Sequence, residues 1–283
     1  MKYYPLFILL LLSQYACKPA HKKINDQGVD IAYNDSGLGD TTLLFVHGWC
    51  INKTYWAPQT DFFRPYYRVV AIDLPGYGES GKNRNSWTVE DFGRDVSSVI
   101  QQLDLKNVIL IGHSMSGQII VEAASHNKDR VIGLVGVDNF KNVWEPSSSG
   151  QDTAATRFYQ AIKNHYKTTV VPLLEKELFL PATDTAIKKR VIDDILHADT
   201  TIAVASLEQG DQYPGIRRLA ALKRKIFLIN SDATPTDTAG LRQKGVNFEV
   251  LYVHQSGHYP MLEKPVEFDS LLRKAIGKIS KGE

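Results

Sequence analysis

Two side chains in this sequence have the types and the local settings that nucleophilic catalysis requires. Ser114 lies in the run G-H-S-M-S-G over residues 112–117, directly after the apolar segment 107–111 and before a helix-forming segment. A strand that turns sharply into a helix around one serine presents the hydroxyl at the carboxyl end of the strand. His258 follows a second apolar segment, and an imidazole with an ordinary pKa of about 6.5 can accept and return a proton near neutrality. The pair therefore indicates attack by an activated serine.

The surrounding motifs resemble those of the α/β-hydrolase family. The run over 112–117 is similar to its G-x-S-x-G nucleophile elbow, with Ser116 in place of the second glycine, and G-H-Y-P-M-L-E-K-P over 257–265 is similar to its histidine loop. The resemblance implies that Ser114 is the nucleophile and His258 the base. His254, four residues earlier, is the rival histidine, but no glycine precedes it.

The acid that orients the histidine is expected after a late strand of the family's sheet. Residues 225–230 read as such a strand, and Asp232 follows them, so we expect Asp232 to accept the Nδ1 hydrogen of His258. Asp138 is the alternative, since it directly follows the apolar segment 131–137 and some family members take their acid from that position.

The oxyanion hole is expected from a third motif. Residues 41–46 read as a strand that leads into His47-Gly48-Trp49-Cys50, which resembles the family's H-G-x loop. By that resemblance, the backbone N–H groups of Trp49 and Met115 would stabilise the oxygen that becomes negative, and one such donor is typically worth about 3 kcal/mol of barrier. The turn D-L-P-G-Y-G-E-S over 73–80 is similar to another family motif and is expected to be architectural.

These motifs need an α/β fold to position them. Strand and helix patterns alternate from about residue 28 to 138, which favours a mostly parallel central sheet with helices on both faces. The strand signal then disappears, so we expect a helical cap over 141–219, inserted after the sixth strand. The core comprises 28–140 and 220–283. Candidate side chains lining the substrate pocket are Trp144, Phe158, Tyr159 and Phe179.

The amino terminus is expected to be an export signal. Residues 1–16 contain a lysine and then an apolar run that is shorter than the roughly 20 residues of a spanning helix. Ala16-Cys17 resembles the cleavage junction of a bacterial lipoprotein, in which Cys17 would carry the lipid; a secreted form or an uncleaved anchor is the alternative. Residues 17–27 are expected to be a linker, and the protein to be exported and to meet the membrane only through its signal or lipid.

Composition narrows the partners. The 283 residues carry 33 Lys and Arg against 31 Asp and Glu, with no basic stripe, so we expect no nucleic-acid partner. There is no H-E-x-x-H run, and two cysteines cannot build a thiolate site, so we expect neither metal nor cofactor. Cys50 is expected to be a buried apolar residue rather than a nucleophile.

The expected activity is hydrolysis of a small or medium carboxylic ester through an acyl-enzyme. A serine at position 114 disfavours epoxide opening and halide displacement, because family members with those activities use aspartate there. Lactones, amides, carbon–carbon bonds and perhydrolysis are alternatives with the same residues. A ligand-binding protein built on a hydrolase scaffold is the alternative of another class.

Overall fold

The computed structural model describes residues 22–143, 146 and 153–283. Its centre is an eight-stranded sheet of order β1-β2-β4-β3-β5-β6-β7-β8, in which β2 pairs antiparallel with both β1 and β4 and all other neighbours are parallel. The strands are β1 Lys22–Asp26, β2 Val29–Asp35, β3 Thr42–Val46, β4 Arg68–Ile72, β5 Val108–His113, β6 Val131–Val137, β7 Ile226–Ser231 and β8 Phe248–Val253. The α/β fold with a mostly parallel sheet is therefore confirmed.

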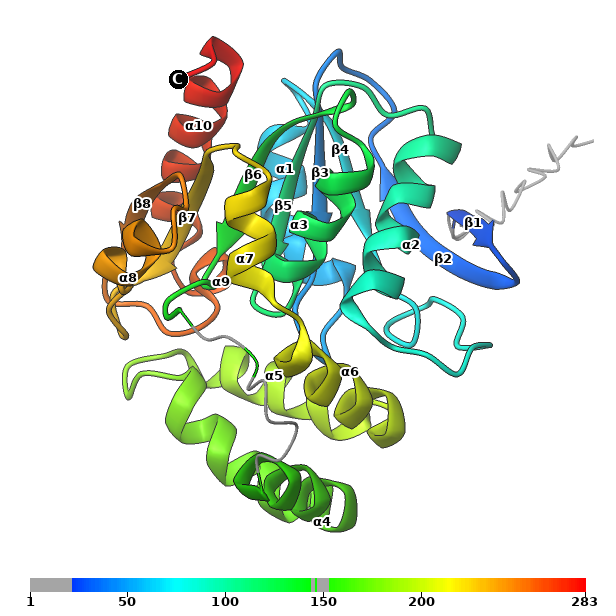
Figure 1. Cartoon of the computed structure of the whole chain (residues 1–283), viewed down its shortest axis with the longest axis vertical. Helices are drawn as coiled ribbons and strands as arrows, with labels where there is room; N and C mark the ends of the chain where they lie inside the picture. The colour runs from blue at the N-terminus through cyan, green and yellow to red at the C-terminus, as the bar shows by residue number, and fades with distance from the viewer. Residues whose placement is uncertain (1–21, 144–145, 147–152) are drawn as a thin grey trace, which may run out of the picture.

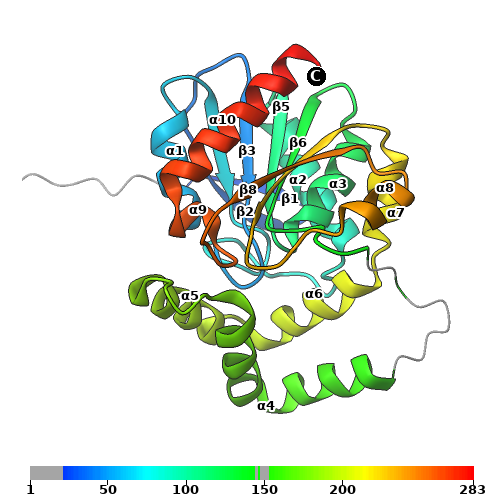
Figure 2. The same ribbon diagram turned by 90° about the vertical axis from the view of Figure 1, so that its left-hand side faces the viewer.

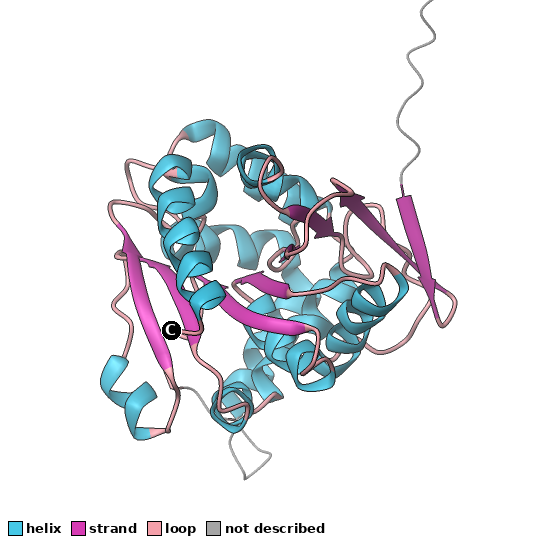
Figure 3. Ribbon diagram, turned by 90° about the horizontal axis from the view of Figure 1, so that it is seen from above, coloured by secondary structure: helices cyan, strands magenta, loops and turns pink. Residues whose placement is uncertain are grey.

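Helices cover both faces of the sheet (Figures 1 and 3). Helices α1 and α10 pack together on one face, while α2 and α3 pack together on the other. The core helices are α1 Ala57–Phe63, α2 Val89–Gln102, α3 Ser116–His126, α7 Gly215–Ala221, α8 Thr238–Gln243, α9 Pro260–Glu263 and α10 Pro265–Lys281, with a 3-10 turn at Lys53–Trp56. This arrangement buries the parallel strands on both sides, as their continuous apolar sequences require.

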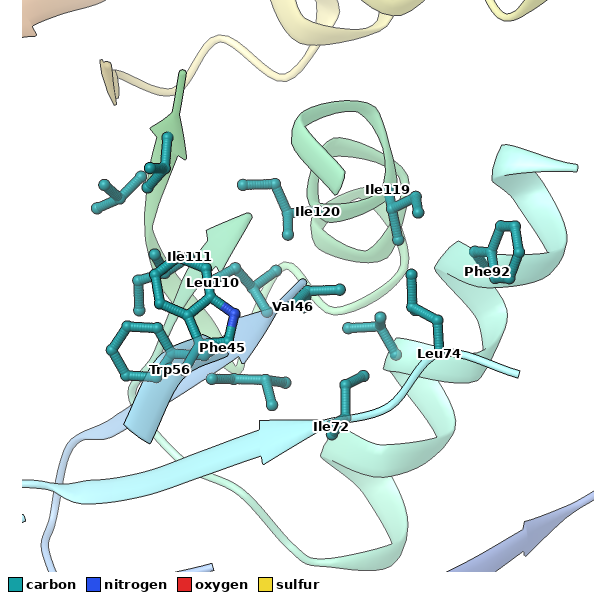
Figure 4. Close-up of a cluster of buried hydrophobic side chains, with 14 of the residues drawn as sticks. Phe45, Val46, Trp56, Ile72, Leu74, Phe92, Leu110, Ile111, Ile119 and Ile120 are labelled. Atoms are coloured by element: carbon teal, nitrogen blue, oxygen red, sulfur yellow. The ribbon is translucent and has the colours of Figure 1, made fainter. Parts of the chain in front are cut away.

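The core is built from the apolar faces of these layers. Figure 4 shows Ile119 and Ile120 of α3 near Val46 and Leu110 of the central strands. All four side chains are fully buried, and so is Trp56, which packs on Phe45 with ring centroids 4.9 Å apart. At the start of α2, the Thr88 side chain accepts from the Asp91 N–H while Asp91 accepts from the Thr88 N–H. This reciprocal cap satisfies two donors at the helix end.

A helical cap follows β6, in the position expected from the sequence. It consists of α4 Thr153–Leu178, α5 Thr185–His197 and α6 Thr200–Gln212, and it lies across the carboxyl ends of the parallel strands (Figure 2). Helix α4 leaves helical geometry at His165. Helix α7, inside the range expected for the cap, instead packs against α3 of the core.

The amino-terminal region differs from expectation in one respect. Residues 22–26, expected to belong to a linker, form β1, whose Ile24 pairs with Ile31 of β2 and is buried. The expected signal and Cys17 lie outside the described residues. Within the described part of the chain, no helix has both the length and the apolar character of a membrane span.

Candidate active site

Ser114 occupies the sharp turn between β5 and α3. Its φ is +53°, a left-handed conformation that costs energy for a residue with a Cβ and that persists where the surroundings fix it. Gly112 is required just before it, because a Cβ at this position would lie 2.4 Å from the carbonyl oxygen of Ser116. The expected strand–turn–helix around Ser114 is therefore present.

Ser116 stands where the family motif has its second glycine, and the turn accommodates its side chain. The side chain is fully buried, and its hydroxyl donates a hydrogen bond to the carbonyl oxygen of His47. The Leu74 N–H donates to His47 Nε2 at 3.0 Å, so the ring proton of neutral His47 lies on Nδ1, which donates to the Gly48 carbonyl at 2.7 Å. Ser116 thus joins the nucleophile turn to the loop after β3.

His258 lies within hydrogen-bond distance of the serine. Its Nε2 is 2.8 Å from Ser114 Oγ, and its Nδ1 is 2.6 Å from Asp138 Oδ2. Because a carboxylate only accepts, Nδ1 carries the hydrogen and Nε2 of the neutral ring is free to accept from the serine. The three side chains form one continuous relay that runs from a buried carboxylate to the nucleophile.

The structure corrects the sequence-based choice of acid. Asp232 contacts His254, not His258: its Oδ2 is 3.0 Å from His254 Nδ1, and its Oδ1 accepts the Gln255 N–H at 2.9 Å. Both members of the Asp232–His254 pair are exposed, whereas Asp138 is buried. The alternative named for this role, Asp138, is the residue beside His258.

Strand register explains the difference between the two carboxylates. β6 and β7 are parallel neighbours, and Val137 pairs with Ile229, so Asp138 leaves the sheet level with Asn230, one residue before the end of β7. The φ of Asp138 is +49°, and its Oδ1 accepts the Ser231 N–H at 2.7 Å, which directs the side chain across the end of β7. Asp232 stands beyond the end of β7 and turns toward β8.

The environment of Asp138 favours its charged form. Burial alone would raise its pKa, but the hydrogen bond from His258, the charge of that ring and the neighbouring Lys141 outweigh burial and hold the pKa of Asp138 well below its ordinary value. Lys141 Nζ lies 2.7 Å from Asp138 Oδ1. Sequence analysis did not identify Lys141, because no motif marks a lysine three residues after an acid.

The histidine loop is joined to the cap. The backbone N–H of His258 donates to the carbonyl oxygen of Leu178, the last residue of α4, at 2.8 Å. Glu263 accepts from the Gly257 N–H at 3.0 Å, and its Oε2 also accepts from the Thr183 hydroxyl at 2.7 Å. Gly257 cannot carry a side chain here, since a Cβ would lie 2.5 Å from the Leu178 oxygen.

His113, next to the nucleophile, is buried and is hydrogen-bonded to the backbone of the histidine loop. Its Nε2 lies 2.8 Å from the His258 carbonyl oxygen, to which it donates. Burial, reinforced by the nearby His258, lowers the pKa of His113 to about 3. His113 is therefore neutral near pH 7 and positions its neighbour.

The two backbone N–H groups expected to form the oxyanion hole are not engaged in other hydrogen bonds among the described residues. Among the described residues, neither the Trp49 N–H nor the Met115 N–H has a hydrogen-bond acceptor. Both residues line a cavity together with Ser114 and His258. The Trp49 indole donates to the Ala203 carbonyl of α6 at 2.7 Å, which ties the loop after β3 to the cap.

Two cavities meet at Ser114. The cap-side cavity, of about 360 Å³, is lined mainly by apolar side chains of α4 and α6, including Leu174 and Leu207. The loop-side cavity, of about 470 Å³, lies against the loops after β6 and β7. Ser114 and His258 line both cavities, so a bound molecule can reach the relay from either side.

The residues expected to line the pocket are divided between these cavities. Phe158 and Tyr159 of α4 line the cap-side cavity, and Phe179 lines the loop-side cavity. Trp144 lies outside the described residues. Cys50 is buried, as expected, and burial raises the pKa of its thiol. In the part of the chain that the structure describes, no three His, Cys, Asp or Glu side chains are grouped to hold a metal ion.

The strand–turn–helix at Ser114 and the cap after β6 are features of one family, and most of the sequence agrees with them. The model of the alpha/beta hydrolase family matches residues 43–271, and the chain belongs to this family.

The chain is similar in sequence or in fold to proteins named as a hydrolase, an esterase and an enol-lactonase. The chain is 28% identical over 269 residues to the 2-hydroxy-6-oxononadienedioate/2-hydroxy-6-oxononatrienedioate hydrolase of Escherichia coli, covering 88% of this chain and 91% of that protein. The fold of the present chain is similar to that of an esterase from Thermogutta terrifontis, with a TM-score of 0.77 and 20% identity. The similarity covers 92% of this chain and 98% of the esterase chain. It is also similar to an enol-lactonase from Burkholderia xenovorans, with a TM-score of 0.76, 17% identity, and 90% and 100% covered.

Proposed function

We propose that this protein is a serine hydrolase that cleaves a small or medium carboxylic ester. The observation that carries the proposal is the Ser114–His258–Asp138 relay, with distances of 2.8 and 2.6 Å at the junction of two cavities. A serine hydroxyl is a weak nucleophile unless a base within hydrogen-bond distance accepts its proton.

In the proposed mechanism, Ser114 Oγ attacks the ester carbonyl carbon while His258 Nε2 takes the serine proton. The carbonyl oxygen becomes negative and is stabilised by the N–H groups of Trp49 and Met115. The imidazolium, stabilised by Asp138, then donates its proton to the departing alkoxide as the carbon–oxygen bond breaks. Water attacks the acyl-enzyme with His258 as base, which releases the acid and restores Ser114.

The lining of the cap-side cavity favours a substrate with an apolar group on one side of the scissile bond. Its walls are largely aliphatic and aromatic, and such surfaces favour apolar ligand groups. Hydrolysis of lactones or amides uses the same residues and stays an alternative. Perhydrolysis, in which hydrogen peroxide replaces water in the second step, is another.

Carbon–carbon bond hydrolysis is a specific second candidate. It is favoured by the similarity to the Escherichia coli hydrolase, whose name indicates a 2-hydroxy-6-oxo substrate. The candidate of another class is a protein that binds an apolar ligand without turnover. It requires none of the hydrogen bonds between Ser114, His258 and Asp138.

The first test is covalent labelling with a fluorophosphonate, which reacts with activated serines. We expect wild-type protein to be labelled and Ser114→Ala and His258→Ala to be unlabelled. Ser125→Ala should be labelled like wild type, since the Ser125 hydroxyl donates to the Glu122 carbonyl within α3. Turnover of p-nitrophenyl esters of increasing chain length then distinguishes ester hydrolysis from cleavage of a 2-hydroxy-6-oxo-dienoate. Folded wild-type protein that resists the label while binding apolar ligands would favour the binding function.

We further propose that residues 1–16 direct export and that Cys17 carries a lipid. The support is the sequence alone: an apolar run after Lys2 and the Ala16-Cys17 junction. Mass spectrometry of the amino-terminal peptide from the native host tests this, with Cys17→Ala as the control that should lose any lipid mass.

A further inference from the structure

The side chain of Lys141 reaches the far side of the acid that contacts His258. Its Nζ lies 2.7 Å from Asp138 Oδ1 and 2.9 Å from Ser231 Oγ, to which it donates. Lys141 is largely buried, with 15% of its side chain exposed, and Asp138 has 3% exposed. A lysine withdrawn from water to this extent needs a compensating partner. The proton transfers proposed above do not use it.

The turn after β6 holds this lysine in place. Asp138 and Phe140 both have φ of +49°, so the chain reverses within a few residues and returns Lys141 toward Asp138. The Lys141 carbonyl accepts the Asp237 N–H at 2.7 Å. The backbone at Lys141 is therefore held both by the turn that precedes it and by the hydrogen bond from Asp237.

The two oxygens of Asp138 have separate partners. Oδ1 accepts from Lys141 Nζ and from the Ser231 N–H, both at 2.7 Å, while Oδ2 faces His258 Nδ1 at 2.6 Å. With Oδ1 held by two donors, the carboxyl group cannot rotate without breaking both contacts. Lys141 therefore restricts the direction in which Oδ2 points.

We infer that Lys141 is a positioning residue for the proposed hydrolysis. Its ammonium group fixes the Asp138 carboxylate and offsets part of that charge, and it thereby sets the lower pH at which His258 can accept the proton of Ser114. This inference rests on the proposed function, because it assigns a role to the relay only if the relay reacts.

Other charged and titratable groups surround the Asp138–His258 pair, and their partners distinguish them from Lys141. They are His113 at the end of β5, Asp232 after β7, Tyr259 and Glu263 in the histidine loop, and Lys176 and Glu177 at the end of α4. Asp232 is paired with His254, Glu263 with backbone N–H groups, and Lys176 with Glu177 on an exposed surface. Among the described residues, Lys141 is the one lysine or arginine in contact with Asp138.

The sign of the effect follows from Coulomb's law. A cation beside Asp138 makes the potential at the imidazole less negative and disfavours the imidazolium. Replacing Lys141 with a neutral residue stabilises the imidazolium, so the ring keeps its proton to higher pH. Because Ser114 reacts only when the ring is neutral, the acid limb of the pH–rate profile moves upward, by about one pH unit for a charge at this range.

The test measures the second-order rate of fluorophosphonate labelling against pH on the full-length protein. The variants are Lys141→Met, which removes the charge, and Lys141→Arg, which keeps it. Lys106→Met is the matched control, since it removes a lysine from an exposed Lys–Asp pair at the amino end of β5, away from the site. We expect the acid limb to move up by about one unit in Lys141→Met alone.

The labelling results distinguish failure of the Lys141 inference from failure of the proposed hydrolase function. An acid limb that stays at the wild-type pH in folded Lys141→Met overturns the inference, even if its melting temperature falls, because a purely structural role changes stability without moving the limb. If Lys141→Met does not fold, Lys141→Gln replaces it, since the amide can still contact Asp138 and Ser231, and the same upward shift is required. Wild-type protein that is unlabelled at every pH overturns the proposed function instead.

Discussion

Asp232 Oδ2 lies 3.0 Å from His254 Nδ1, so the chain carries a second carboxylate–imidazole pair at the carboxyl edge of the sheet. This pair is exposed, and no serine is bonded to its imidazole among the described residues. The buried pair, Asp138 and His258, contacts Ser114. The two carboxylates follow neighbouring strands and both histidines follow β8, but the pairs differ in burial and in contact with Ser114, which makes a direct comparison possible.

Replacement of each acid tests which pair reacts. In Asp138→Asn the amide oxygen is expected to stay with the two donors that contact Oδ1, Lys141 Nζ and the Ser231 N–H, so that the NH2 group faces His258 Nδ1. An NH2 group cannot accept the Nδ1 hydrogen and favours the wrong tautomer of the ring, so we expect kcat for a p-nitrophenyl ester to fall by about 10³- to 10⁴-fold. Asp232→Asn, the matched control, should change kcat by less than about twofold, because exposed pairs of this kind contribute little. The reverse result would return the acid to Asp232.

Ser116 offers a test of the connection between the nucleophile turn and the loop after β3. Ser116→Ala leaves the His47 carbonyl without its hydroxyl donor in a buried site, so we expect a loss of about 1 to 2 kcal/mol in the free energy of unfolding. Urea denaturation measures this loss. An unchanged midpoint would mean that the hydroxyl contributes nothing. Ser97→Ala, at another buried serine whose hydroxyl donates to a carbonyl, is the comparison.

Buried neutral histidines predict how stability depends on pH. The pKa of His113 is about 3 in the folded protein and about 6.5 in the unfolded chain, so the unfolded chain binds more protons between these values. The stabilisation is complete above pH 6.5 and is lost as the pH falls toward 3. We expect His113 alone to reduce the free energy of unfolding by about 1.5 kcal/mol between pH 6.5 and pH 5.

The measurement compares urea denaturation of wild type and His113→Gln at the two pH values. The variant should lose less stability on acidification, by about that amount. Burial also lowers the pKa of His47, so the variant keeps a residual dependence in the same direction. Equal slopes for both proteins would contradict a neutral, buried His113.

The cap-side cavity predicts a limit on substrate size. Leu207 lines it from α6, and Leu207→Trp should fill part of the roughly 360 Å³. We expect turnover of long-chain p-nitrophenyl esters to fall at least tenfold while that of the acetate changes little, because only the longer chain needs the lost volume. An equal reduction for all chain lengths would place the variable group elsewhere.

Strong local patterns allowed most of the architecture to be predicted. The sheet, the capped start of α2, the turn at Ser114 and the cap after β6 each have a signal within a few residues: an apolar run, a Thr–Asp pair, or small residues around a serine. Strand β1 was missed because only one of its five residues, Ile24, is clearly buried, so its sequence shows little apolar character.

The acid was the main error in the site, and its cause is not local. Asp138 and Asp232 both follow apolar strands, and nothing in either segment shows which carboxylate turns inward. That depends on the register between β6 and β7 and on a positive φ at Asp138. Lys141 was missed for the same reason, since its importance comes from a contact with Asp138 rather than from a motif.

The hydrogen bond from the His258 N–H to the Leu178 carbonyl has a consequence for how this enzyme scaffold can change. One backbone hydrogen bond connects the cap, which would select the substrate, to His258, which would transfer the proton. A cap exchanged for that of a relative must therefore bring a carbonyl to the same point, or new selectivity will come with a misaligned base. Chimeras that keep residues 153–183 and exchange only α5 and α6 retain this contact, whereas those that also exchange α4 must rebuild it.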